Sequence, residues 1–323
     1  MGNSDIRSLS TITDIDYDTI SGVDVAVDAS NWMYKYMTTT VEFTDTHVYT
    51  TENDTEVPEL LGCFQGLKKF KENNLNAVFV FDGVAHDLKE DELERRREKK
   101  EEAETNAENA SNMIQQAKYD SRTQRLTSGK IDRVRKLVQL CGFDTVDAPS
   151  AAEGQAAYMA QQDSAHAMSD DYDTIVFGSP NTIRNFTSST RQLENVNFEQ
   201  TLQDNNLTHE ELIWAVLLCG TDYNDGIHGV GPATAKKLVR KYDSFENLLQ
   251  DNDYTIHNWE EIISIYADPD INPHAEYNYP TGNAKLDTLE TFLTETWELP
   301  QDEIEPTLSF LRESEQDTTL LDY

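Results

Sequence analysis

Six carboxylates are placed where acidic side chains could gather around a cation, and four of them follow strand-like apolar runs. Residues 23–27 run into Asp28, residues 77–81 run into Asp82, and residues 165–168 open into an acidic segment. Ligands gather outside the carboxyl ends of strands in open α/β sheets, so we expect these acids to converge on one crevice. Converging carboxylates without His or Cys are typical of sites for Mg²⁺ or Mn²⁺. The candidate metal ligands are Asp28, Asp82, Glu153, Asp171, Asp173 and Asp222.

Each of these acids also has an ordinary structural explanation. Asp28 and Asp82 could each cap a helix or stabilise a turn. Asp171 and Asp173 could form an Asx turn, and residues 150–153 fit the S-x-x-E capping box at the start of a helix. The whole set, rather than any single member, therefore favours a metal site.

A glycine-rich segment, residues 226–237, is the most specific local motif. Gly229 and Gly231 precede a proline that suits the first position of a helix, so free backbone N–H groups are predicted at a helix N-terminus. These groups could bind a phosphate, and Lys236 and Lys237 add positive charge on the following helix. The pattern indicates a DNA-binding helix-hairpin-helix motif. The alternative is a glycine turn between two packed helices.

Length and composition indicate a globular protein of a reducing compartment. The 323 residues are 37% hydrophobic, which is enough for one ample core or for two units. No run of eighteen apolar residues occurs, and the N-terminus lacks a signal pattern, so we expect a cytoplasmic protein without a membrane segment. The three cysteines lie far apart without CxxC spacing, which indicates buried thiols.

The formal charge of −34 argues against a nucleic-acid partner unless the basic residues are localised. They are localised, because 13 of the 26 Lys and Arg residues lie within residues 89–136 and another group follows the glycine-rich segment. An acidic chain with few lysines is what we expect of a protein kept soluble in molar salt. The alternative is an ordinary acidic protein with no polyanionic partner.

Alternating strand-like and helical patterns predict an α/β fold with a mainly parallel central sheet flanked by helices. Predicted helices include residues 60–71 and 151–161. Residues 88–136 are crowded with Glu, Lys, Arg and Gln and have almost no strand character, so we expect helices that project from the sheet. The alternative for this segment is a solvated charged helix. The pattern is helical from residue 208, apart from a loop expected at 266–284.

Taken in order, these motifs resemble the flap endonuclease family of structure-specific 5′ nucleases over nearly all of the chain. The acidic composition most resembles a haloarchaeal member. The segments that carry the resemblance are Met1-Gly2, Val27-Asp28-Ala29-Ser30 with Tyr34, Val80-Phe81-Asp82-Gly83 with Leu88-Lys89, Ala148-Pro149-Ser150 before Glu153, Asp170-Asp171-Tyr172-Asp173 with Phe177-Gly178-Ser179-Pro180, and Cys219-Gly220-Thr221-Asp222-Tyr223 before the hairpin.

The resemblance implies a divalent-metal-dependent 5′ flap endonuclease with 5′ exonuclease activity, acting on DNA in replication and repair. It implies two Mg²⁺ ions, for which Mn²⁺ would substitute, and hydrolysis by a two-metal mechanism. One ion would be held by Asp28, Asp82 and Glu153, and the other by Asp171, Asp173 and Asp222, with Glu153 close to both.

The resemblance also implies roles in binding DNA. Lys89 and Arg96 are seven residues apart, about two helical turns, and would clamp the scissile phosphate. Tyr34 would stack on a base unpaired at the junction, although a core tyrosine is the alternative. The hairpin with Gly229 and Gly231 would hold duplex DNA, in the family with help from a K⁺ ion.

On this basis the chain divides into five regions. They are an N-terminal nuclease region (1–83), a helical arch for the 5′ flap (84–136), an internal nuclease region (137–206), a C-terminal helix-hairpin-helix region (207–265), and C-terminal helices with a tail (266–323).

Two departures from the family pattern stand out. Ala151 occupies a position, two residues before the expected ligand Glu153, where the family has a second glutamate. The tail also departs from the sliding-clamp pattern of Gln, an aliphatic residue three positions later and adjacent aromatics. Here Gln316 is followed by Thr319, Asp322 and Tyr323. A sliding clamp is therefore a possible partner, but the tail matches its binding motif poorly.

The departure at Ala151 leaves a second function open, a DNA-junction-binding paralogue with weak or no cleavage. Six retained carboxylates would serve no purpose in a pure binder, which favours the enzyme. A third alternative, an RNA-directed nuclease with a related carboxylate site, is disfavoured by the hairpin. Cleavage of 5′-flap DNA compared with single-stranded RNA would separate the three.

Overall fold

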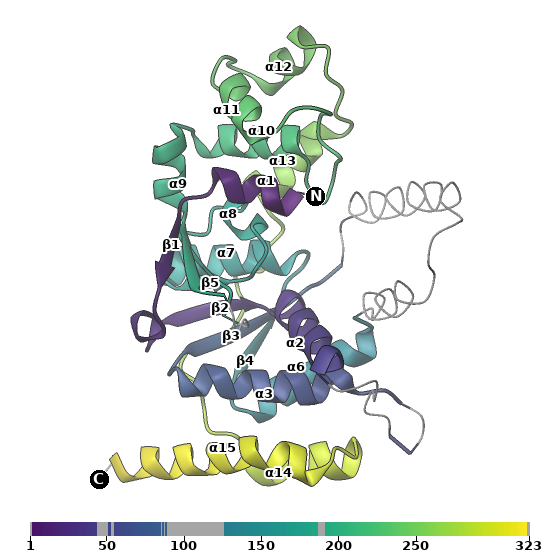
Figure 1. Cartoon of the computed structure of the whole chain (residues 1–323), viewed down its shortest axis with the longest axis vertical. Coiled ribbons are helices and arrows are strands. Elements are labelled where there is room, and N and C mark those ends of the chain that lie inside the picture. Colours follow the sequence, from purple (N-terminus) through teal and green to yellow (C-terminus); the bar gives the residue numbers. More distant parts are fainter. Residues whose placement is uncertain are drawn as a thin grey trace.

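A seven-stranded sheet lies at the centre of the molecule (Figure 1). The computed structural model describes residues 2–43, 51–52, 55–84, 86, 88, 126–186 and 191–321. The strands are β1 (Ile12–Ile15), β2 (Asp24–Asp28), β3 (Asn76–Phe81), β4 (Asp144–Asp147), β5 (His166–Met168), β6 (Asn181–Arg184) and β7 (Leu193–Asn197).

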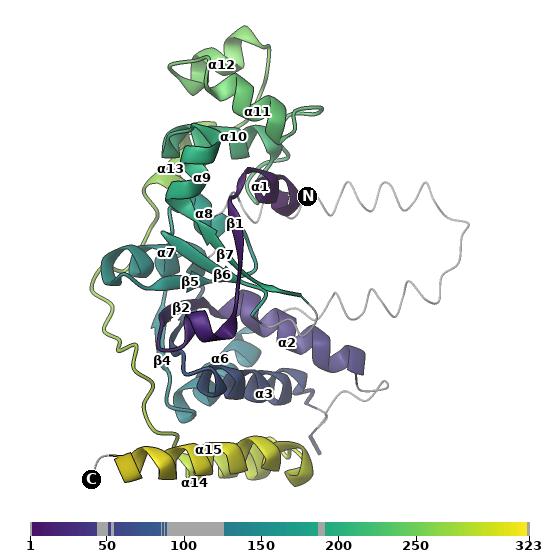
Figure 2. The same ribbon diagram turned by 60° about the vertical axis from the view of Figure 1, so that its left-hand side comes forward.

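Helices cover both faces of this sheet and extend beyond it at either end (Figure 2). The helices are α1 (Gly2–Leu9), the 3-10 helix η1 (Tyr17–Ile20), α2 (Ala29–Phe43), α3 (Pro58–Glu72), α6 (Ser128–Leu140), α7 (Ala152–Asp163), α8 (Asp173–Val176), α9 (Phe198–Asn205), α10 (His209–Cys219), α11 (Pro232–Val239), α12 (Phe245–Asp251), α13 (Trp259–Ala267), α14 (Leu286–Thr291), the π-helix η2 (Phe292–Thr296) and α15 (Gln301–Leu321).

The strand order is β1-β7-β6-β5-β2-β3-β4. The five strands from β6 to β4 are parallel, and β7 runs antiparallel to both β6 and β1. The chain builds β3 and β4 on one side of β2 and then returns to add β5 and β6 on the other side. Strand order therefore reverses between β2 and β5, the position where open α/β sheets bind ligands. The mainly parallel α/β fold predicted from the sequence is confirmed.

Side chains alternate between the two faces of the sheet because successive residues of a strand point in opposite directions. Val27 of β2 and Phe79 of β3 pack into the core beneath α3 and α6, while Ala26 and Val78 pack against α7. Figure 1 shows α2, α3 and α6 on one face and α7 on the other. The same alternation directs the acid at the end of β2 and the acid after β3 toward the α7 face.

Two further groups of helices extend the molecule. Helices α1, α8 and α10–α13 share a second hydrophobic core at the end where the N-terminus lies. Helices α14 and α15 pack against α6 and α3 at the opposite end. Residues 268–284 between α13 and α14 contain no helix or strand, so the loop expected at 266–284 is confirmed except for residues 266 and 267, which end α13.

The structure rules out one of the ordinary explanations for the acids. The capping box considered for residues 150–153 is absent, because the N-cap of α7 is Ala151, which makes no side-chain cap hydrogen bond. The apolar residues 174–176 belong to the short helix α8. The expected arch lies largely outside the described residues, and residues 128–136 begin α6, which packs on α3.

Candidate active site

Three of the candidate ligands meet at the carboxyl edge of the sheet. Asp28 ends β2, Asp82 directly follows β3, and Glu153 lies in the first turn of α7. All three line one cleft of about 290 Å³, together with His86 and Tyr223. The crevice predicted from the strand ends therefore exists, and α7 closes one side of it.

Asp28 is the most buried of these acids, with 3% of its surface exposed. Its carboxylate accepts hydrogen bonds from the backbone N–H of Asn31 (3.0 Å) and from the hydroxyl of Ser169 (2.9 Å). Burial, together with the negative charges of Asp82 and Asp171, raises the pKa of Asp28 to about 7, although these two hydrogen bonds act to lower it. A buried carboxylate that faces two other acids is an arrangement that a cation would stabilise.

Ser169 connects Asp28 to the next acidic segment and was not identified from the sequence. Its hydroxyl donates to Asp28 and accepts from the backbone N–H of Asp171 at 3.1 Å. Asn31 makes a parallel link, because its side-chain oxygen accepts from the backbone N–H of Asp170 at 3.1 Å. The only sequence signal for Ser169 is its position between the end of β5 and the acidic segment.

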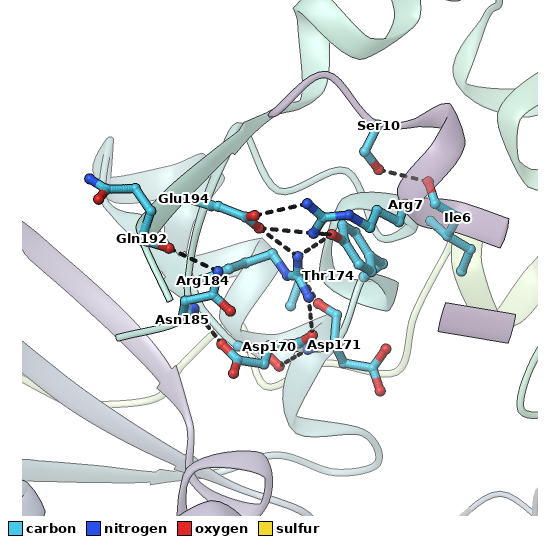
Figure 3. Close-up of polar contacts among 12 residues, drawn as sticks. Ile6, Arg7, Ser10, Asp170, Asp171, Thr174, Arg184, Asn185, Gln192 and Glu194 are labelled. Carbon is cyan, nitrogen blue, oxygen red and sulfur yellow. Dashed lines mark hydrogen bonds and ion pairs between the residues drawn. The ribbon is translucent and has the colours of Figure 1, made fainter. Parts of the chain in front are cut away.

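The turn at residues 170–173 is fastened by a charged cluster on the side opposite Asp171 (Figure 3). Arg184 donates to the backbone oxygen of Asp170 (2.7 Å), and its guanidinium lies over the ring of Tyr172, 3.5 Å from the centroid. Glu194 accepts hydrogen bonds from both Arg184 (3.0 Å) and Arg7 of α1 (2.9 Å).

Asp170 has a structural role in this turn. Its carboxylate accepts from the backbone N–H of Asn185 at 2.6 Å and forms an ion pair with Lys35. In Figure 3 the side chain of Asp171 extends away from Arg184. Asp170 therefore makes contacts that hold the turn together, while the side chain of Asp171 points away from the Arg184 cluster.

Asp173 and Asp222 lie near the buried hydroxyl of Tyr266. Asp173 is the first residue of α8, and its Oδ2 accepts a hydrogen bond from Tyr266 at 3.1 Å. Asp222 lies in the turn after α10, in which Thr221 and Asn224 pair. Burial raises the pKa of Tyr266 well above its usual value, and the charges of Asp173 and Asp222 raise it further. The hydroxyl therefore stays protonated and donates.

The chemistry of these donors fits a hard divalent cation. All six acids offer carboxylate oxygens, and the pKa of Asp28 is raised by neighbouring negative charge that a cation would compensate. In the described part of the chain, Asp28, Asp82 and Glu153 share a cleft but form no ready-made group of three or more metal ligands, so a bound cation would draw their carboxylates closer together.

Ala151 lies beside these acids. It is half-buried, precedes the first residue of α7 and lines the same cleft as Asp28, Asp82 and Glu153. It also lines a neighbouring pocket of about 180 Å³ between α7 and α13. A longer side chain at this position has space toward the cleft.

The remaining candidates lie away from the cleft or outside the described residues. Tyr34 is on α2 and is 40% exposed, so the alternative of a core tyrosine is wrong. Lys89 and Arg96 lie outside the described residues.

The glycine-rich segment forms the turn that leads into α11. Gly229 has a φ of +80°, which favours glycine, and a Cβ added at Gly229 or Gly231 would meet no atom within 4 Å. Pro232 occupies the first turn of α11, as predicted. Lys237 is exposed, whereas Lys236 donates to the side chain of Asn205 at 3.0 Å. The two lysines are therefore not equivalent, since Lys236 already has a partner within the protein.

Two family models match the chain. The XPG N-terminal domain matches residues 4–103, and the XPG I-region matches residues 142–222. Flap endonuclease 1 of Haloarcula marismortui is 42% identical over 94% of both chains. Flap endonuclease 1 of Halobacterium salinarum is 40% identical, also over 94% of both chains.

Solved structures agree with these matches. The flap endonuclease-1 from Methanococcus jannaschii superposes with a TM-score of 0.75 at 26% identity, over 94% of this chain and 96% of that one. The catalytic core of Rad2 in complex with DNA substrate has a TM-score of 0.70 at 20% identity, over 93% and 96%, which shows a shared fold. No helix of the described residues combines the length and apolar character needed to cross a membrane.

Proposed function

This chain belongs to the flap endonuclease family of structure-specific nucleases, and we propose that it hydrolyses DNA at 5′ flaps with the help of divalent cations. The observation that carries this proposal is the position of Asp28. It is buried at the topological switch point of the sheet, where its pKa is raised by burial and by Asp82 and Asp171. This is the environment expected of a carboxylate that binds a cation.

We propose that the acids hold two cations. Mg²⁺ is the expected ion and Mn²⁺ a substitute, since both prefer oxygen ligands. When bound, such ions would supply Lewis-acid stabilisation of the charge that develops on a phosphodiester. One would be held by Asp28, Asp82 and Glu153, and the other by Asp171, Asp173 and Asp222, with Glu153 close to both.

Other residues would bind and orient the DNA. Lys89 and Arg96 would contact the scissile phosphate, because two cationic side chains seven residues apart on a helix can reach the same anion. Tyr34, which is exposed on α2, would stack on an unpaired base. The backbone at Gly229 and Gly231, together with a K⁺ ion, would hold the duplex, because the space above both glycines is open.

The proposed division of the chain follows these roles. Residues 1–83 and 137–206 would form the nuclease unit, 84–136 the arch for the flap, and 207–265 the duplex-binding unit. Residues 266–323 would complete the scaffold through α14 and α15. Gln316 and Thr319 of the tail lie within α15.

The competing proposal is a junction-binding relative that cuts weakly or not at all. It rests on Ala151, which lines the cleft where the family pattern has a glutamate. The remaining acids would then be retained without catalysis. Keeping six carboxylates near one another without a cation is costly because like charges repel, so we favour the nuclease.

A labelled double-flap DNA, incubated with Mg²⁺ or Mn²⁺ over a series of KCl concentrations, tests the proposal. We expect cleavage at the flap base, no cleavage of single-stranded RNA, and loss of cleavage with retained DNA binding in Asp173→Asn. Binding without cleavage in the unaltered protein would support the junction-binding relative. An Asp173→Asn protein that cuts at the original single-turnover rate would contradict the metal assignment.

A further inference from the structure

Tyr266 makes a direct contact with one of the proposed metal ligands from a distant part of the chain. It belongs to α13, yet its hydroxyl donates to Oδ2 of Asp173 at 3.1 Å, across 93 positions of the sequence. The tyrosine is 1% exposed. The donor side of this part-buried hydrogen bond is therefore shielded from water, which strengthens the bond and makes its loss costly.

Two aromatic contacts fix the ring that carries this hydroxyl. The ring of Phe177, just after α8, lies 4.9 Å from the Tyr266 ring, and the ring of Tyr223 lies 5.7 Å away with an interplanar angle of 82°. Tyr223 directly follows Asp222. Tyr266 thus contacts the Asp173 segment through its hydroxyl and the Asp222 segment through its ring.

We propose that Tyr266 is a positioning residue for the second cation site. By holding Asp173 through its hydroxyl and the Asp222–Tyr223 turn through its ring, it sets the orientation and separation of two ligands that come from separate segments. This inference rests on the proposed function. It adds a residue of the C-terminal helical region to the supporting structure of the nuclease site.

The expected loss of metal affinity can be judged from other metalloproteins, in which hydrogen-bond partners orient the metal ligands. Removing such a partner typically weakens metal binding by roughly 10- to 100-fold. Tyr266→Phe deletes only the hydroxyl and retains the ring contacts. We therefore expect about a 10-fold weaker affinity for the cation.

Tyr277 provides a matched control. Its hydroxyl donates to Oδ2 of Asp163 at 2.6 Å, so Tyr277→Phe also deletes a tyrosine–aspartate hydrogen bond. This pair is exposed and neither residue lines the cleft. A difference between the two variants would therefore report the position of the bond rather than its chemistry.

The primary measurement is calorimetric titration with Mn²⁺ alone, without DNA. Tyr266→Phe should raise the Mn²⁺ dissociation constant about 10-fold, and Tyr277→Phe should leave it unchanged. The affinity for flap DNA in EDTA should be the same in both variants, because the hydroxyl acts only through Asp173. Single-turnover rates should recover in Tyr266→Phe at high Mg²⁺.

A double-substitution cycle separates positioning from general stability. Once Asp173→Asn has removed the ligand, adding Tyr266→Phe should not weaken Mn²⁺ binding further. Tyr266→Met removes both the donor and the ring, so it should weaken Mn²⁺ binding at least as much as Tyr266→Phe does, and it gives a second reading if the phenylalanine variant fails to fold.

Two results would overturn the inference: equal Mn²⁺ affinity in Tyr266→Phe and the unaltered protein, or an undiminished effect in the Asp173→Asn background. Failure of the unaltered protein to bind Mn²⁺ or cut flap DNA would instead refute the proposed function.

Discussion

The Asp82 carboxylate accepts a hydrogen bond from the backbone N–H of Ala152 at 2.8 Å, so an acid at the end of β3 caps the N-terminus of α7. A strand end and a helix start 70 residues apart are thereby joined beside the proposed metal site. The contact fixes Glu153, one residue further along α7, relative to Asp82. Asp28 has a similar double role, because it accepts from the N–H of Asn31 in the first turn of α2.

Two substitutions of Asp82 should separate the effect of its hydrogen bond to the N-terminus of α7 from the effect of its negative charge. Asp82→Asn retains an oxygen that can accept from Ala152 and should change the free energy of unfolding by only a few tenths of a kcal/mol, while Asp82→Ala should lower it by about 1 kcal/mol. Both should impair Mg²⁺-dependent cleavage. Urea unfolding in EDTA, compared with flap cleavage, measures the two effects. Equal stability of the two variants would show that the cap contributes nothing.

Ala151→Glu should increase cleavage at limiting Mg²⁺, because a carboxylate at this position would extend into the cleft that Glu153 lines. Ala151→Gln is the control with the same length and no charge. Without metal the added acid should lower stability through repulsion from its neighbours. The check is a Mg²⁺ titration of the single-turnover rate. Superimposable curves for all three proteins would mean that the alanine has no bearing on activity. Asp170 is not available to replace the missing acid, because it is already paired with Lys35.

The raised pKa of Asp28 predicts a pH-dependent cost in the metal-free protein. The unfolded chain ionises Asp28 near its ordinary value of 3.8, whereas the folded chain holds the proton up to about pH 7. Between these values the unfolded state binds fewer protons, so the contribution of Asp28 to stability falls as the pH rises.

Asp28→Asn removes this dependence. Its stability relative to the unaltered protein should rise across this window by at most about 1.4 kcal/mol per pH unit. Urea unfolding at several pH values in EDTA checks the difference. Parallel pH profiles for the two proteins would be incompatible with the shifted pKa.

Arg184→Met should destabilise the protein by about 3 kcal/mol, because it removes one partner of a buried ion pair. Arg184 and Glu194 expose only 8% and 10% of their side chains. Glu72→Gln, in the more exposed pair of Lys68 and Glu72, should cost about 0.5 kcal/mol or less. Thermal and urea unfolding compare the two. Similar small losses would show that the cluster behind Asp170 does not support the fold.

Salt should stabilise the folded protein, because charges that sum to −34 repel one another until they are screened. The Debye length falls from about 10 Å at 0.1 M to about 3 Å at 1 M. The melting temperature followed by circular dichroism should therefore rise between roughly 0.1 and 2 M KCl, the range set by that screening. A flat or falling melting temperature would remove the argument for a protein adapted to high salt.

The sequence determined the sheet and the edge at which its acids lie. The unbroken apolar runs of β2 and β3 require cover on both faces of the sheet, supplied by α3 on one and α7 on the other. The two-residue period of a strand then carries Asp28 and Asp82 to the same side. The position of Pro232 after two glycines likewise determined the start of α11. These features are local, since they depend on residues a few positions apart.

Only the tertiary structure decided how the acids are held. Ser169 joins Asp28 to Asp171, Asp82 caps α7, and Tyr266 reaches Asp173 from α13. Each contact joins segments that are distant in sequence, and no local periodicity encodes such a pairing. The capping box at residues 150–153 was wrong for the same reason. A local pattern suggested a cap from Ser150, but the packing of β3 against α7 supplied Asp82 instead, because a buried helix N-terminus takes whichever acceptor the fold brings to it.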